Sequence, residues 1–194
     1  MSIIEESRKF AVTKYGPDPM TGYPHAMRVI EHVKWLSRLH SGNEELLEIS
    51  AIFHDIAFDG KNIATHSVES ANICDTFLRD QNYPAVKRNR IAKIIKRHTI
   101  RDWTIEGKPE SSEDKILFDA EALERITMHG FLRFVTMSFR LPYNSTKEVI
   151  NAAERFIDEN YQAMFFDESK IKAQENYLLV KNAISHIKDE LDIQ

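Results

Sequence analysis

The 194-residue sequence has little of what secreted and membrane proteins need. Its single cysteine, Cys74, cannot form an internal disulfide and suits a reducing compartment. No apolar run approaches the roughly 20 residues that span a bilayer, and no N-terminal segment resembles a signal peptide. We therefore expect a cytoplasmic protein that does not associate with a membrane.

A strong excess of charge of one sign is also absent. The formal net charge is −4, so the overall charge gives no reason to expect a nucleic-acid partner. Hydrophobic residues make up 42% of the sequence and charged residues 29%, which is enough for a proper core and a hydrated surface.

Glycine and proline are scarce, with six of each, and none interrupts a periodic segment. The segments between them have helical length and a helical repeat of apolar residues, without the sustained alternation typical of strands. We therefore predict an all-α protein. Residues 1–130 are predicted to form a core with an N-terminal helix, and residues 131–194 a C-terminal helical extension packed on it. The sequence leaves open whether the protein forms a homodimer.

The most informative residues are the adjacent pair His54 and Asp55. They follow the apolar run at residues 49–53, which predicts a core-facing helix. A carboxylate on that face is expelled from the core unless a charged partner compensates it. A metal ion is a natural partner, because imidazole and carboxylate are its common ligands.

Four further residues with metal-binding side chains lie on the apolar faces or at the ends of predicted helices. His25 and Asp119 share helical faces with apolar residues, so they are predicted to point inward. His66 opens an apolar helical segment, and His98 ends another. The order in which these residues follow one another is itself informative.

This order resembles the HD-domain metal-dependent phosphohydrolase superfamily, in particular its small bacterial and archaeal branch, whose pattern is H…HD…D on a helical core. The matching pieces are residues 25–29, 51–56 and 119–124, and the resemblance covers roughly residues 20–127. The last motif of that branch usually reads Asp-Ala-Asp-Arg-Leu-Asp, whereas this chain has Asp-Ala-Glu-Ala-Leu-Glu. The resemblance implies that residues 1–130 form an HD-domain helical bundle.

The resemblance also implies a divalent metal ion bound by His25, His54, Asp55 and Asp119. Such ligands accept manganese, iron, nickel, cobalt, zinc or magnesium, with one or two ions per chain. Asp55 could bridge to a second ion if His66 and His98 complete its site. Otherwise these two histidines are candidates for contacting a substrate phosphate or for protonating the leaving oxygen. Asp55, His66 and His98 are therefore the predicted catalytic residues.

The implied activity is hydrolysis of a phosphomonoester or phosphodiester by metal-activated water, with a nucleotide or related small phosphoester as substrate. His66, His98 and Arg97 are the predicted substrate-binding residues. Arg97 lies in a basic run whose ordinary role is a solvated helix face, and Lys61 has a similar, weaker claim to a phosphate. Two alternatives stay open: an HD-fold di-iron oxygenase, and a metal-stabilised binding module without turnover.

Overall fold

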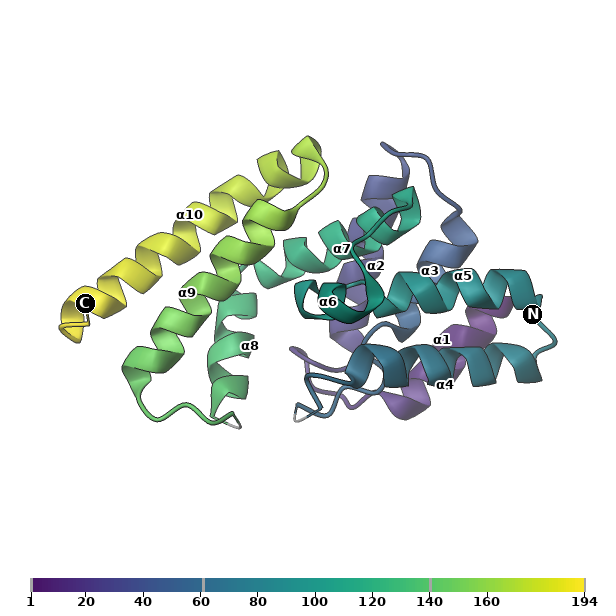
Figure 1. Ribbon diagram of the computed structural model, residues 1–194, viewed down its shortest axis with the longest axis horizontal. Helices are drawn as coiled ribbons and strands as arrows, with labels where there is room; N and C mark the ends of the chain where they lie inside the picture. Colours follow the sequence, from purple (N-terminus) through teal and green to yellow (C-terminus); the bar gives the residue numbers. More distant parts are fainter. Residues whose placement is uncertain (1, 61, 140, 194) are drawn as a thin grey trace. The chain divides into compact units, whose positions relative to one another are not determined.

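The computed structural model describes residues 2–60, 62–139 and 141–193 (Figure 1). These residues form ten α-helices and one short 3₁₀-helix, and they contain no strand, which confirms the predicted all-α class. The chain forms two compact units, residues 1–121 and 122–194. The predicted boundary after residue 130 stays a prediction.

Most of the helices belong to the first unit (Figure 1). In chain order they are α1 (Ile3–Lys14), α2 (Tyr23–Ser37), α3 (Glu44–Phe53), α4 (His66–Asp80), α5 (Ala85–Lys96), the 3₁₀-helix η1 (Ile100–Asp102), α6 (Trp103–Glu106) and α7 (Ser112–Arg125). Helix α7 begins in the first unit and ends in the second.

Helix α3 is the centre of the first unit. It contacts α1, α2, α4 and α5, and its residues from Leu46 to Phe53 are buried except Glu48. A helix that is apolar around most of its circumference has to be covered on all sides, and these four neighbours provide the cover. The His54–Asp55 pair follows the last residue of α3 directly, so the pair lies at the end of the most buried helix.

Local capping fixes where several of these helices begin. Asn43 accepts a hydrogen bond from the backbone N–H of Leu46 at the start of α3. Before α7, the Ser111 hydroxyl accepts from the Asp114 N–H at 3.1 Å, and the Asp114 carboxylate accepts from the Ser111 N–H at 3.4 Å. This reciprocal pair is a capping box, and it sets the start of the helix that carries Asp119 and Glu121.

The start of α2, which carries His25, depends on close backbone packing at Gly22. A Cβ atom at Gly22 would lie 2.0 Å from the backbone oxygen of Gly16, so no side chain fits there. The Gly22 N–H donates to the Asp18 carbonyl, and the Asp18 carboxylate accepts from the backbone of Met20. The loop before α2 is therefore folded tightly against the first turn of the helix.

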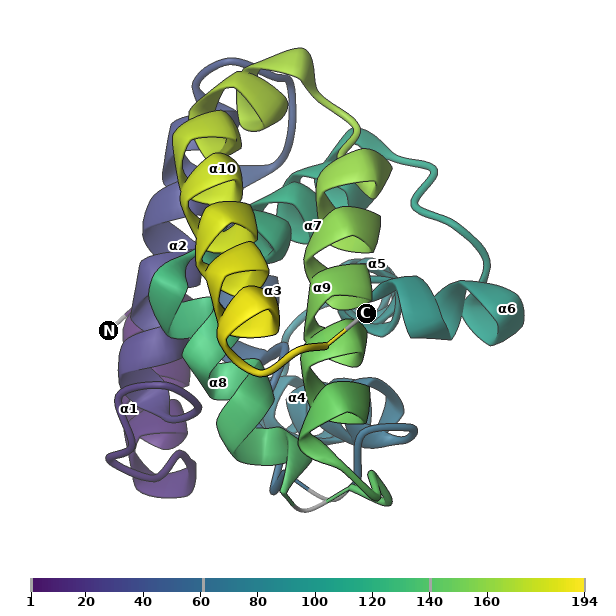
Figure 2. The ribbon, with the colours of Figure 1, turned by 90° about the vertical axis from the view of Figure 1, so that its left-hand side faces the viewer.

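The second unit contains the end of α7 and three further helices, α8 (Met128–Ser138), α9 (Thr146–Ala163) and α10 (Asp167–Glu190) (Figure 2). These three helices contact one another. The rings of Tyr161 and Tyr177 stack at 4.1 Å, and Lys181 pairs with Glu154 and Asp158 on α9. Among the described residues, no helix is long and apolar enough to cross a membrane.

Candidate metal centre

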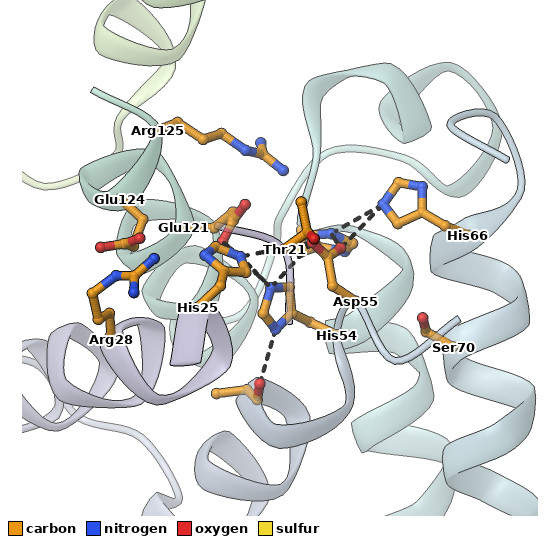
Figure 3. A network of polar contacts seen from close by, with 12 residues as sticks. Thr21, His25, Arg28, His54, Asp55, His66, Ser70, Glu121, Glu124 and Arg125 are labelled. Atoms are coloured by element: carbon orange, nitrogen blue, oxygen red, sulfur yellow. Dashed lines mark hydrogen bonds and ion pairs between the residues drawn. The ribbon is translucent and has the colours of Figure 1, made fainter. Parts of the chain in front are cut away.

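Six buried side chains of metal-binding type come together in the first unit, each at most 5% exposed (Figure 3). They come from the first turn of α2, the turn after α3, the start of α4, the segment after α5, and α7. They are His25, His54, Asp55, His66, His98 and Glu121.

The first group of donor atoms lies around His25 and His54, whose Nε2 atoms are 3.3 Å apart. The Oε2 atom of Glu121 lies 3.2 Å from the His25 Nε2 and 3.4 Å from the His54 Nε2. The Oδ2 atom of Asp55 lies 3.7 Å from each of these nitrogens. Two nitrogens and two carboxylate oxygens therefore face a common point.

The second group lies on the other side of the Asp55 carboxylate. Its Oδ1 atom is 3.4 Å from the His66 Nε2 and 3.3 Å from the His98 Nε2, and these two nitrogens are 3.4 Å apart. Asp55 thus offers one oxygen to each group, and Figure 3 shows it between His25 and His54 on one side and His66 on the other. A carboxylate in this position could serve as a ligand shared by both groups.

The backbone fixes the tautomer of three of the histidines. His54, His66 and His98 each place Nδ1 within 2.6–2.9 Å of the carbonyl oxygen three residues earlier. A carbonyl oxygen only accepts, so Nδ1 carries the proton and Nε2 of the neutral ring presents its lone pair. The Nε2 atoms of His66 and His98 therefore face each other as two acceptors, an arrangement that a cation between them stabilises.

The donor set fits divalent first-row cations. Bonds of about 2.1 Å at tetrahedral angles place donor atoms about 3.4 Å apart, close to the 3.2–3.7 Å separations within both groups. Four imidazoles and two carboxylates also match the ligand preference of manganese, iron, cobalt, nickel and zinc. His25, His54, Asp55 and Glu121 would hold one ion, and Asp55, His66 and His98 a second.

The pKa values of His54 and His66 are shifted in opposite directions. Burial favours the neutral form of His54, but the nearby carboxylates of Asp55 and Glu121 outweigh burial and raise its pKa above the usual value. For His66, burial dominates over the attraction of Asp55 and lowers the pKa.

The carboxylate that joins the first group comes from Glu121, whereas Asp119 belongs to neither group. Asp119 is fully buried on the same helix. Residues two positions apart on an α-helix differ by about 200° around its axis, so Asp119 and Glu121 leave α7 on different faces. The predicted role of Asp119 as a metal ligand stays a prediction. The signal for Glu121 was present in the sequence, because the branch that the chain resembles has a carboxylate at this position of its last motif.

The guanidinium of Arg97, the predicted phosphate ligand, is hydrogen-bonded to other groups of the protein. Its Nη1 atom donates to the carboxylates of Glu110 and Asp114, both at 3.0 Å, and its Nε atom donates to the carbonyl of Glu106. Although burial opposes it, hydrogen bonds from the backbone N–H of Glu110, from Ser111 and from Arg97 lower the pKa of Asp114. These bonds tie the end of α5 to the start of α7 and to the segment before it. Lys61 lies outside the described residues.

Comparison with known proteins identifies the family. The profile of the HD domain matches residues 22–126, and a comparison with curated proteins gives no match. A solved structure from Lactobacillus plantarum is 19% identical with a TM-score of 0.82, covering 98% of this chain and 97% of its own.

Two further solved structures are similar in fold. YpgQ from Bacillus subtilis, solved in complex with ADP, is 15% identical with a TM-score of 0.71, covering 96% of this chain and 97% of its own. An HD-superfamily hydrolase from Bacillus thuringiensis is 17% identical with a TM-score of 0.67, covering 98% and 97%. These likenesses confirm the predicted HD-type helical fold. Since the profile covers residues 22–126 of 194, the chain belongs to the HD domain family, the metal-dependent phosphohydrolase superfamily that its motifs resemble.

Proposed function

We propose that this protein hydrolyses a phosphoester bond of a nucleotide or a related small molecule at a centre of two divalent ions. The observation that carries this proposal is the position of Asp55, whose two oxygens each lie within 3.7 Å of a separate pair of histidines. Two ions bridged by one carboxylate are a recurring arrangement for displacement at phosphorus.

Ions bound at the two groups would lower the pKa of a coordinated water molecule and withdraw charge from a phosphoryl oxygen. The chain itself supplies the fixed geometry. Asp55 sets the spacing of the two positions, and the Nδ1–H bonds of His54, His66 and His98 prevent their rings from turning. The substrate-binding role predicted for His66 and His98 is then replaced in our proposal by direct ligation of the second ion.

Substrate is proposed to approach from the side of His66. The side chain of His66 is 7% exposed, whereas those of His25, His54, Asp55, His98 and Glu121 are at most 2% exposed. The ring of Phe58 lies edge-on against His66 at 5.3 Å and forms an apolar edge at this position. A phosphate that arrives here meets the second group of ligands first.

A nucleotide is the substrate class that we favour. The support is that the similar YpgQ structure holds ADP. The loop after Asp55 lacks the Glu-Asp pair typical of guanosine tetraphosphate hydrolases, which disfavours that particular nucleotide. Nucleoside mono-, di- and triphosphates are therefore the first compounds to assay, together with a generic phosphomonoester and a phosphodiester.

The test compares turnover of this panel, with Mn²⁺ added, by the wild type and three alanine variants. His54→Ala and Asp55→Ala are expected to lower kcat/KM at least about 100-fold, because each removes a direct ligand. His186→Ala is the matched control, since this histidine is 76% exposed on α10. Absence of turnover by the metal-loaded wild type, or unchanged turnover by Asp55→Ala, would contradict the proposal.

The same four histidines and two carboxylates would also suit a pair of irons, which keeps the di-iron oxygenase as a second candidate. The two functions differ in which metal is present and in what is consumed. Two irons per chain in protein purified without added metal, with oxygen consumption and no phosphate release, would favour the oxygenase. Phosphate release supported by manganese would favour the hydrolase.

A further inference from the structure

The three histidines whose Nδ1–H groups are anchored differ in what holds the anchoring carbonyl. The carbonyl that orients His54 belongs to Ala51 within α3, and the one that orients His98 belongs to Ile95 within α5. Both carbonyls are fixed by the helix that contains them. The carbonyl that orients His66 belongs to Ile63, which lies in the turn before α4.

A second donor reaches this loop carbonyl. Arg101 donates from Nη1 to the Ile63 oxygen at 3.0 Å, and His66 donates from Nδ1 to the same oxygen at 2.9 Å. Arg101 is exposed and lies in η1, three residues after His98. One arginine therefore links the segment after His98 to the carbonyl that orients His66, across 38 residues of sequence.

The segment that carries Arg101 is itself well anchored. The indole N–H of Trp103 donates to the carbonyl oxygen of Arg97. The backbone N–H of Asp102 donates to the carbonyl oxygen of Thr99. The loop before α4 has a different set of bonds, in which Asn62 contacts Ala57 and Glu69 and so ties the loop to itself and to α4. The bond from Arg101 joins these two segments.

We propose that Arg101 is a positioning residue for the second ion, because it holds the Ile63 carbonyl that orients His66 toward His98. This inference rests on the proposed two-ion centre and concerns only the position formed by Asp55, His66 and His98. The first position is independent of it, because His25, His54 and Glu121 lie on α2, after α3 and on α7. Loss of Arg101 should therefore weaken binding of the ion at Asp55, His66 and His98 and leave binding of the first ion unchanged.

The test is a Mn²⁺ titration of the wild type, Arg101→Ala and Arg101→Lys. Binding is monitored by calorimetry and by electron paramagnetic resonance. The wild type is expected to bind two ions, with an exchange-coupled signal when both are present. Arg101→Ala should bind the first ion unchanged and the second about tenfold more weakly, at the lower end of the effect of removing a residue that orients a ligand. Arg101→Lys should recover most of the loss, since an ammonium can also donate to a carbonyl.

Arg79→Ala is the matched control, because Arg79 has a 59% exposed side chain at the end of α4 and makes long contacts within that helix, with Asp75 at 4.0 Å and with the Thr76 hydroxyl at 3.5 Å. Equal affinities in the wild type and Arg101→Ala would overturn the inference, as would equal weakening of both ions or a wild type that binds a single ion. A higher KM with unchanged metal affinity would instead show that Arg101 contacts substrate, and would also overturn it. Two-ion binding with the expected loss, but without phosphoester turnover, would contradict the proposed hydrolysis and leave the role of Arg101 standing.

Discussion

Replacing Glu121 with glutamine is predicted to remove most of the stabilisation that a metal ion gives to the fold. The substitution keeps the shape of the side chain and removes the charge from an oxygen 3.2 Å from His25 and 3.4 Å from His54. Residues that only orient a ligand change metal affinity about 10–100-fold when removed. Removing the charge of a direct ligand should therefore weaken metal affinity at least about 100-fold.

The size of the effect on melting follows from mass action. An ion that binds only the folded state stabilises it by RT ln(1 + [ion]/Kd), which is about 2.7 kcal/mol at 100 times Kd. A variant with 100-fold weaker affinity gains only about 0.4 kcal/mol at the same concentration. At roughly 2–4 °C per kcal/mol for a chain of this size, the ion at the group that contains Glu121 should contribute about 5–11 °C to the Mn²⁺-dependent rise in the Tm of the wild type and about 1–2 °C to that of Glu121→Gln. The ion at the second group adds to the shift of both proteins.

The assay is thermal unfolding of chelator-treated protein with and without Mn²⁺. Asp119→Asn is the matched comparison, because Asp119 is a buried carboxylate on the same helix that lies outside both groups of donor atoms. It should keep the full Mn²⁺-dependent shift even if its Tm without metal is lower. A shift that is lost in Asp119→Asn and kept in Glu121→Gln would refute the assignment of Glu121 as the ligand.

Three further predictions concern stability. Asp114→Asn removes the charge that faces Arg97 and should lower the free energy of unfolding by about 2 kcal/mol at pH 7. Because the folded-state pKa of Asp114 is lowered, this difference should persist down to the ordinary value of 3.8 and disappear as the pH falls below it; a difference that is unchanged at pH 2 would contradict the account. Ile52→Ala, in the fully buried centre of α3, should lower the free energy of unfolding in urea by about 2–5 kcal/mol, whereas Val86→Ala at a 79% exposed position should change it by less than about 0.5 kcal/mol. Adding a chelator to metal-loaded protein should lower the Tm of the wild type and leave that of Asp55→Ala unchanged, and equal responses would mean that the stabilising metal binds elsewhere.

The fold and most of the candidate centre could be predicted because their signals are local. The apolar run at residues 49–53, just before His54, predicted the central helix. His25, His54, Asp55, His66 and His98 were recognisable from their order, and the structure brings all five together.

The remaining features depend on contacts through space. Helical periodicity assigns a face to Asp119 and to Glu121, but it does not say which face meets the histidines of other helices. The basic run suggested Arg97 as a phosphate ligand, whereas its partners Glu110 and Asp114 are brought to it by the tertiary fold. Arg101 and Ile63 are 38 positions apart in the sequence, so no local sequence pattern predicts their contact.

The most direct test of the two-ion centre is the metal content per chain of the wild type and Asp55→Ala, each purified without affinity-tag metal and then equilibrated with Mn²⁺. Asp55 offers one oxygen to each group of ligands, so its removal should affect both positions. The account predicts two ions per chain in the wild type and fewer than one in a folded Asp55→Ala variant. Equal metal content in the two proteins, or no bound ion in the wild type, would contradict it.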